Sequence, residues 1–215
     1  MKAIMISIKP YWVCAIADEI KTVEVRKYAL YKAIKKLIDE YGYALIYFYV
    51  TKDNIRENDN NALGRIFSYE TALKVINSKG KVIASFKCEK VEEIYPNEDG
   101  FLNTISLTER MLLDKSFLSL NEMCDYFGDE AIQNEPVLGC AIYVPKLNIF
   151  YEPKELSEFQ RLKKLPSCTR CLFRNSKCDL KNYLRCYEHT CYELVKIDKA
   201  PMTYCYVEVD EWVKN

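Results

Sequence analysis

The sequence lacks a net charge, a long hydrophobic run and an apolar N-terminal core, and each absence excludes a class of protein. Its 31 basic and 31 acidic residues balance, whereas a protein that coats nucleic acid carries a strong positive excess. The longest apolar run, residues 44–50, is too short to cross a bilayer. The first ten residues, MKAIMISIKP, have no long apolar core, so we expect neither a secretory signal nor a membrane partner.

Histidine is nearly absent, and His189 is the only one in the chain. Cysteine is plentiful by comparison, with ten residues. Because no secretory signal is expected, we interpret these cysteines as reduced thiols or metal ligands. We therefore expect a soluble, cytoplasmic protein. The richness in Ile, Lys, Asn and Tyr is typical of an AT-rich bacterial or phage genome.

Helical and strand patterns alternate along the chain and predict an α+β fold. Strands are predicted at 3–8, 22–26, 43–50, 81–94, 139–151 with a break near Pro145, and 203–209, and helices at 11–20, 30–41 and twice within 107–128. Such an order favours one mostly antiparallel sheet that curls into a small barrel with flanking helices. We interpret residues 1–215 as a single domain, with 160–200 as a cysteine-rich insertion before the last strand.

Two pairs of residues predict where the helices within 107–128 begin. Ser106 with Glu109, and Ser119 with Glu122, both have the spacing of a capping box. In this motif the serine hydroxyl and the glutamate carboxylate each satisfy a backbone N–H of the first helical turn.

A polar strand near the N-terminus is the first candidate site. Residues 21–26, KTVEVR, alternate so that the valines face the core while Thr22, Glu24 and Arg26 share the other face, with Lys21 at the strand's start. A cation beside a carboxylate in a cleft can orient a water, bind a phosphate or hydrogen-bond the edge of a base. The alternative is a surface ladder of ion pairs, which contributes roughly 0–1 kcal/mol.

Lys21 and Glu24 can divide acid and base roles in two ways. A lysine near an arginine has a lowered pKa when it is partly buried, so Lys21 can act as the base. Alternatively, Glu24 is the base and Lys21 stabilises charge. We add Lys9 as a further ligand contact, and Tyr143 and Tyr204 as walls on which a base can stack.

A cysteine cluster between residues 168 and 191 is the second candidate site. Its members are Cys168, Cys171, Cys178, Cys186 and Cys191. The two-residue gap between the first two lets both thiolates bind one ion, and four of the five predict a structural zinc site. The segment has little core-forming pattern, so the metal supplies folding energy. Idle thiols, a disulfide formed after purification and an iron–sulfur cluster are the alternatives.

Several segments carry a resemblance to a known family. ISIKP (6–10), a short helix and KTVEVRK (21–27) resemble the opening signature of ASCH domains, which belong to the PUA-like barrel superfamily. Later segments resemble the phage and prophage branch of that family, in the same order, over nearly the whole chain: YFYVTK (47–52), GKVIASFKCEKVEEI (80–94), LNIFYEPKELSEF (147–159) and MTYCYVEV (202–209). The resemblance implies a small β-barrel with a cleft beside the 21–26 strand, and recognition of RNA or a modified nucleobase.

Some small members of the family are amidohydrolases that remove an acyl group from N4-acetylcytidine. Their motif resembles K-T-x-T-x-R, in which the lysine and the second threonine are held to be catalytic. Lys21, Thr22 and Arg26 match this motif, but Glu24 occupies the position of the second threonine. The proposed nucleophile of those enzymes is therefore missing here.

Three functional hypotheses follow. The first is a module that binds RNA, a nucleoside or a nucleotide in a cleft edged by Lys9, Lys21, Thr22, Glu24 and Arg26. The second is an amidohydrolase or nuclease that acts on N4-acylated cytidine nucleosides or RNA, with Lys21 and Glu24 as its catalytic residues. The third is a phage or defence module that holds a protein partner through the inserted region.

Overall fold

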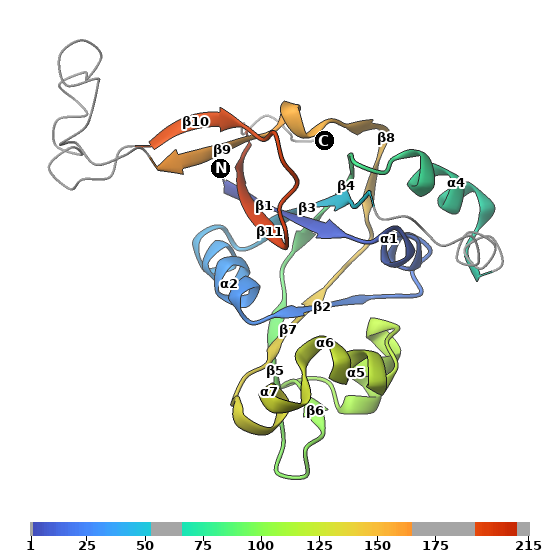
Figure 1. Ribbon diagram of the computed structural model, residues 1–215, viewed down its shortest axis with the longest axis vertical. Helices are drawn as coiled ribbons and strands as arrows, with labels where there is room; N and C mark the ends of the chain where they lie inside the picture. Colours follow the sequence, from blue (N-terminus) through green and yellow to red (C-terminus); the bar gives the residue numbers. More distant parts are fainter. Residues whose placement is uncertain (1, 53–65, 165–191, 210–215) are drawn as a thin grey trace, which may run out of the picture.

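Two β-sheets with helices packed between and beside them make up the structure, a computed structural model that describes residues 2–52, 66–164 and 192–209 (Figure 1). The predicted α+β class is confirmed. In chain order the elements are β1 (Lys2–Ile8), α1 (Pro10–Ala17), β2 (Val23–Lys27), α2 (Ala29–Tyr41), β3 (Ala44–Val50), α4 (Tyr69–Asn77), β4 (Val82–Cys88), β5 (Val91–Pro96), β6 (Leu102–Asn103), α5 (Glu109–Ser116), α6 (Leu120–Phe127), α7 (Asp129–Asn134), β7 (Gly139–Tyr143), β8 (Asn148–Lys154), a 3₁₀ turn (Leu156–Glu158), β9 (Gln160–Lys164), β10 (Tyr192–Lys196) and β11 (Tyr204–Glu208).

The strands form two sheets where the sequence predicted one. The larger sheet has the order β10-β9-β11-β1-β3-β4-β8, with β1 and β3 parallel, and the smaller has the order β2-β7-β5-β6. The prediction of a single sheet is wrong because the predicted strands 81–94 and 139–151 are each two strands. In both cases one part joins the larger sheet (β4, β8) and the other joins the smaller (β5, β7). The predicted break near Pro145 is confirmed, and it is where the chain passes between sheets.

Three apolar clusters hold these layers together. The largest lies between the larger sheet and helices α1, α2 and α4, and it extends to Cys140 and Ile142 of β7. The second packs α5 and α6 against Val23 and Val25 of β2. The third covers the opposite face of the larger sheet, around Phe159. Both faces of the smaller sheet are therefore covered where β2 and β7 pair.

Local signals explain several of the helix ends. Pro10 begins α1, at the position where a missing N–H costs least. Gly42 ends α2 with a φ of 80°, and the capping box of Ser119 and Glu122 opens α6, as predicted. Within the described ranges, no helix has both the length and the apolar character needed to cross a membrane.

The second predicted capping box, Ser106 with Glu109, is wrong. Helix α5 starts one residue after Thr108, so Ser106 lies outside it. The Ser106 hydroxyl donates to Glu92 of β5, and the Glu109 carboxylate accepts the N–H of Leu102. Both side chains therefore fasten the loop before α5 to the smaller sheet.

Glu92 is the centre of a hydrogen-bond network in that sheet. Its carboxylate accepts from Thr104 Oγ1 at 2.6 Å, from the Tyr143 hydroxyl at 3.0 Å and from Ser106, and it pairs with Lys90 Nζ at 3.1 Å. Burial raises the pKa of the Glu92 carboxyl, but these donors together outweigh burial and lower its pKa to about 2.

This lowered pKa predicts a pH-dependent stability. In the unfolded chain the carboxyl takes up a proton near its ordinary pKa of 4.5, whereas the folded one stays charged down to about 2. The contribution of Glu92 is thus fully present above about pH 4.5 and is lost as the pH falls toward 2. We expect Glu92→Gln to lower the free energy of unfolding at neutral pH and to flatten its decline over the acid range. Urea denaturation at stepped pH measures both effects, and identical acid profiles for the two proteins would contradict the assignment.

Candidate functional site

A cleft of about 640 Å³ lies between the two sheets, beside β2. Its lining comes from the ends of β1 and β3, from α1, from β2, and from α6 on the opposite side. Four of the predicted site residues line it together: Lys9, Lys21, Glu24 and Arg26. The structure thus brings three residues of the 21–26 segment together with Lys9, which follows β1 of the larger sheet.

Lys21 is held on several sides in the cleft wall. Only 2% of its surface is exposed, and its Nζ donates to the carbonyl of Ser116 at 2.6 Å and lies 3.3 Å from Glu24 Oε2. The same nitrogen lies over the ring of Trp12, 5.1 Å from its centre. Burial lowers the pKa of Lys21, Glu24 opposes this shift, and Arg26 adds to it. The lowered pKa that the sequence predicted therefore has burial as its main cause.

Lys21 donates to a carbonyl that has no hydrogen-bond partner within α5, because it lies at the end of that helix. Phe117 follows the helix with a φ of 54°, a left-handed conformation that is unfavourable for a residue with a Cβ. The last carbonyls of a helix have no partner within the helix. Lys21 donates to the carbonyl of Ser116, and the backbone N–H of Thr22 donates to the carbonyl of Lys115 at 2.9 Å. The start of β2 is thereby fastened to the end of α5.

Arg26 joins the two sheets. Its Nη2 donates to the carbonyl of Ser7 in β1 at 2.8 Å, and its Nε lies 2.7 Å from Glu24 Oε1. The Nε–H bond is not aligned with that oxygen, so the contact is an ion pair without a hydrogen bond. Glu24 therefore has a cation on each of its two oxygens, with Lys21 on the other.

Glu24 is buried, with 5% of its surface exposed, which excludes a surface ladder of ion pairs. The strand alternates as predicted, but the face that carries Glu24 and Arg26 is covered as well. Glu24 is paired across the sheet with Ile142, which belongs to the largest apolar cluster. A buried, paired carboxylate of this kind depends on both of its cations.

Three predicted site residues lie away from the cleft lining. The side chain of Thr22 is exposed, and its backbone joins β2 to its neighbours. The Tyr143 hydroxyl donates to Glu92, and Lys90 lies over its ring. The Tyr204 hydroxyl donates to the carbonyl of Ala29 at 3.3 Å. Neither tyrosine is a wall of this cleft, because neither is among the residues that line it.

The opposite wall of the cleft was missed by sequence reasoning. It comes from α6, where Glu122, Asp125 and Tyr126 line the cleft, and Trp12 of α1 and Met202 complete the lining around it. Spacings of three and four residues place the three α6 side chains on one helical face. That pattern could have been noticed, but nothing in the sequence indicated that this face lies across from β2.

The charges in the lining balance. Three cations, Lys9, Lys21 and Arg26, face three carboxylates from β2 and α6. Among these, Glu122 is already used as the capping residue of α6, where its carboxylate accepts from Ser119. The cleft therefore carries charged groups without being strongly positive, which distinguishes it from a groove that follows a phosphate backbone.

The predicted zinc ligands lie outside the described residues. Cys168, Cys171, Cys178, Cys186 and Cys191 all fall within 165–191. The strands on either side of that stretch, β9 and β10, pair with each other at the edge of the larger sheet. In the part of the chain that the structure describes, no three His, Cys, Asp or Glu side chains gather as metal ligands do.

No protein-family model and no curated protein matches the chain. Among solved structures, it is similar to ASCH from Zymomonas mobilis, with 15% identity and a TM-score of 0.40 over 88% of this chain and 96% of that one. It is also similar to the N-terminal domain of McrB from Staphylothermus marinus, with 12% identity and a TM-score of 0.38 over 73% and 77% of the two chains. At this level of similarity the comparisons assign no role to any residue.

Proposed function

We propose that the cleft binds a nucleobase, presented by a nucleoside or by single-stranded RNA. The observation that carries the proposal is a hollow of about 640 Å³ that has both aromatic walls and fixed polar groups. This volume lies within the range of roughly 300–1,000 Å³ that is typical of small-ligand sites. Trp12 and Tyr126 offer ring faces or edges to a flat heterocycle, and stacking on aromatic rings is the usual way that proteins hold an unpaired base.

The polar groups can be given separate roles. Lys9 is exposed at the rim, where its ammonium can reach a phosphate or a base oxygen. Arg26 is fixed by Ser7 and Glu24, so its remaining N–H groups are held in one orientation, as reading the edge of a base requires. Asp125 is an exposed acceptor on the opposite wall, suited to an exocyclic amino group. Lys21 positions Glu24 and α5, and it contributes to the wall.

Hydrolysis is the less favoured use of the same residues. The Lys21 nitrogen already contacts Ser116 and Glu24, and the side chain is nearly inaccessible, so a substrate carbonyl has little access to it. Glu24 also occupies the position of the second threonine in the amidohydrolase motif. We therefore expect no release of acetate when N4-acetylcytidine is incubated with the protein. Release that Lys21→Met abolishes would instead support the enzyme hypothesis.

A shallow salt dependence is the expected signature of base recognition by a neutral cleft. For a single strand, the slope of log K against log salt is about −0.7 for each phosphate neutralised. Lys9 is the exposed cation of the lining, so we expect a slope smaller in magnitude than about 1.5 for a ten-nucleotide RNA of mixed sequence. Titrations followed by fluorescence anisotropy at several salt concentrations measure it. A slope near −4 would show that many phosphates are neutralised, and would contradict recognition through the base.

The finer assignments remain proposals supported by sequence motifs. They are an ASCH-type barrel of the PUA-like superfamily, its phage and prophage branch, and RNA as the natural partner. The segments 6–10 and 21–27 support the first of them, and both contribute to the cleft. A structural zinc in the cysteine cluster is a separate proposal, supported by the spacing of Cys168 and Cys171.

A further inference from the structure

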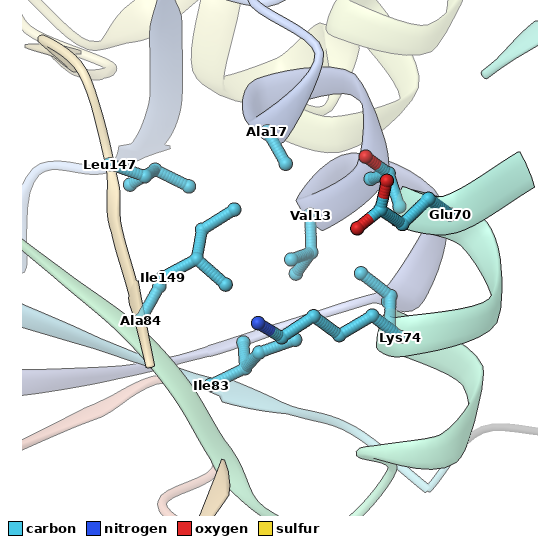
Figure 2. A pocket seen from close by; sticks show the side chains of 10 residues that line it. Val13, Ala17, Glu70, Lys74, Ile83, Ala84, Leu147 and Ile149 are labelled. Carbon is cyan, nitrogen blue, oxygen red and sulfur yellow. The ribbon is translucent and has the colours of Figure 1, made fainter. Parts of the chain in front are cut away.

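A second, smaller pocket lies beside α1 (Figure 2), and none of its lining residues lines the cleft. It has a volume of about 140 Å³ and lies between α1, α4 and the strands β4 and β8. Most of its lining is apolar, with Val13 and Ala17 from α1 and Ile83 and Ile149 from the two strands. A cavity of about 150 Å³ lined by such side chains is large enough for a benzene molecule.

The pocket is built on a fixed junction between two helices. Asp18, at the end of α1, accepts the N–H of Ser68 at 2.6 Å and the hydroxyl of Thr71 at 2.7 Å. Ser68 is the N-cap of α4, and Thr71 itself lines the pocket. These hydrogen bonds hold α1 and α4 together at one end. They therefore fix the spacing of the two helices beside the pocket.

A lysine brings the only positive charge of the described lining into this apolar space. Lys74 of α4 is half-buried, and in Figure 2 its amine extends toward Ile83 and Ile149. No ion pair of the described residues includes it. Glu70, one turn earlier in α4, is exposed and lies on another side of the pocket in the same view. A cation beside apolar walls is stabilised by an anion that brings its own apolar surface.

We propose that this pocket binds a small monocarboxylate whose apolar part is about the size of a benzene ring, with the carboxylate paired to Lys74. The charge of Lys74 favours a carboxylate, and the volume of the pocket limits the size of the ligand's apolar part. The site is separate from the cleft, so this proposal does not rest on nucleobase binding. Glu70 is a like charge at the rim, and it lowers the affinity for any anion.

Benzoate is the probe, and methyl NMR spectra of the full chain are the readout. We expect benzoate to shift the methyl signals of Val13, Val75, Ile83, Leu147 and Ile149 in a saturable way, with benzyl alcohol binding about tenfold more weakly because it lacks the charge. The proposal would be overturned if methyl signals shifted over the whole surface, or if no methyl signal of the pocket shifted.

Charge variants test the pairing directly. Lys74→Met keeps the length of the side chain and should weaken benzoate binding about tenfold, whereas Glu70→Gln should strengthen it. Lys36→Met makes the same change on the exposed face of α2 and should leave binding unaltered. Equal affinities of the Lys74→Met protein and the wild type would overturn the proposal.

A further variant fills the space without changing charge. Ala17→Leu should abolish benzoate binding while thermal unfolding shows a folded protein, and unchanged binding would count against the pocket as the site. Tyr126→Ala in the cleft should leave benzoate binding intact. Failure of nucleobase binding and failure of this proposal are therefore distinguishable.

Discussion

Replacement of Glu24 by glutamine is expected to lower the free energy of unfolding by about 3 kcal/mol or more. The substitution keeps the size of the side chain and removes its charge. Lys21 and Arg26 each lose their carboxylate partner, although both remain largely buried, with 2% and 15% of their side chains exposed. Breaking a buried pair is costly because it leaves an uncompensated charge away from water. Urea denaturation at neutral pH measures the change.

A surface ion pair provides the matched control. Lys35 and Asp39 pair on α2, with 46% and 59% of their side chains exposed. Asp39→Asn makes the same chemical change there, and we expect it to cost no more than about 1 kcal/mol. If Glu24→Gln were no more costly than Asp39→Asn, the ion pairs of Glu24 would be as weak as those of a solvated strand face.

Replacement of Tyr126 by alanine is expected to weaken the binding of a ten-nucleotide RNA about tenfold or more. Stacking of one base on an aromatic ring contributes roughly 1–3 kcal/mol, which is a factor of about 5 to 150 in affinity. Tyr126 lines the cleft with 38% of its surface exposed, so its loss should remove a contact without opening the core. Fluorescence anisotropy at constant salt measures the affinity.

Two variants separate stacking from other effects. Tyr126→Phe keeps the ring and should retain most of the affinity. Tyr151→Ala removes the same side chain from β8, where it is 93% exposed and does not line the cleft, and should have no effect. If all three variants bound RNA as the wild type does, α6 would not be a wall of the binding site.

The part of the site that was predicted correctly consists of residues that lie close together in the sequence. The spacing of Lys21, Glu24 and Arg26 predicted that their charges lie together, and the structure has them in ion-pairing contact. Strand alternation also placed Glu24 opposite Val23 and Val25. What alternation cannot predict is whether the second face of a strand is covered, because that depends on which distant element packs there. Here β7 pairs with β2, and Ile142 of β7, opposite Glu24, belongs to the largest apolar cluster, so Glu24 is buried.

The parts that sequence reasoning missed depend on long-range packing. Tyr143 has the character of a stacking residue, yet its hydroxyl is used by Glu92 in the smaller sheet. Tyr126 lies in a helix that was predicted, but its partner strand is far away in the sequence. Two predicted strands proved to be four, and this explains why the surroundings of Tyr143 and Tyr126 were not predicted. Within each of these two segments the chain passes from one sheet to the other, and this places α6 against β2 and β5 against β7.

The indole N–H signal of Trp12 tests the cleft most directly. The chain has two tryptophans, and Trp12→Phe identifies which of the two signals belongs to the cleft. In ¹H–¹⁵N spectra we expect this signal to shift in a saturable way as ribonucleosides or the ten-nucleotide RNA are added. A Trp12 signal that stays in place with every one of these ligands at millimolar concentration, in a protein that remains folded, would contradict nucleobase binding in this cleft.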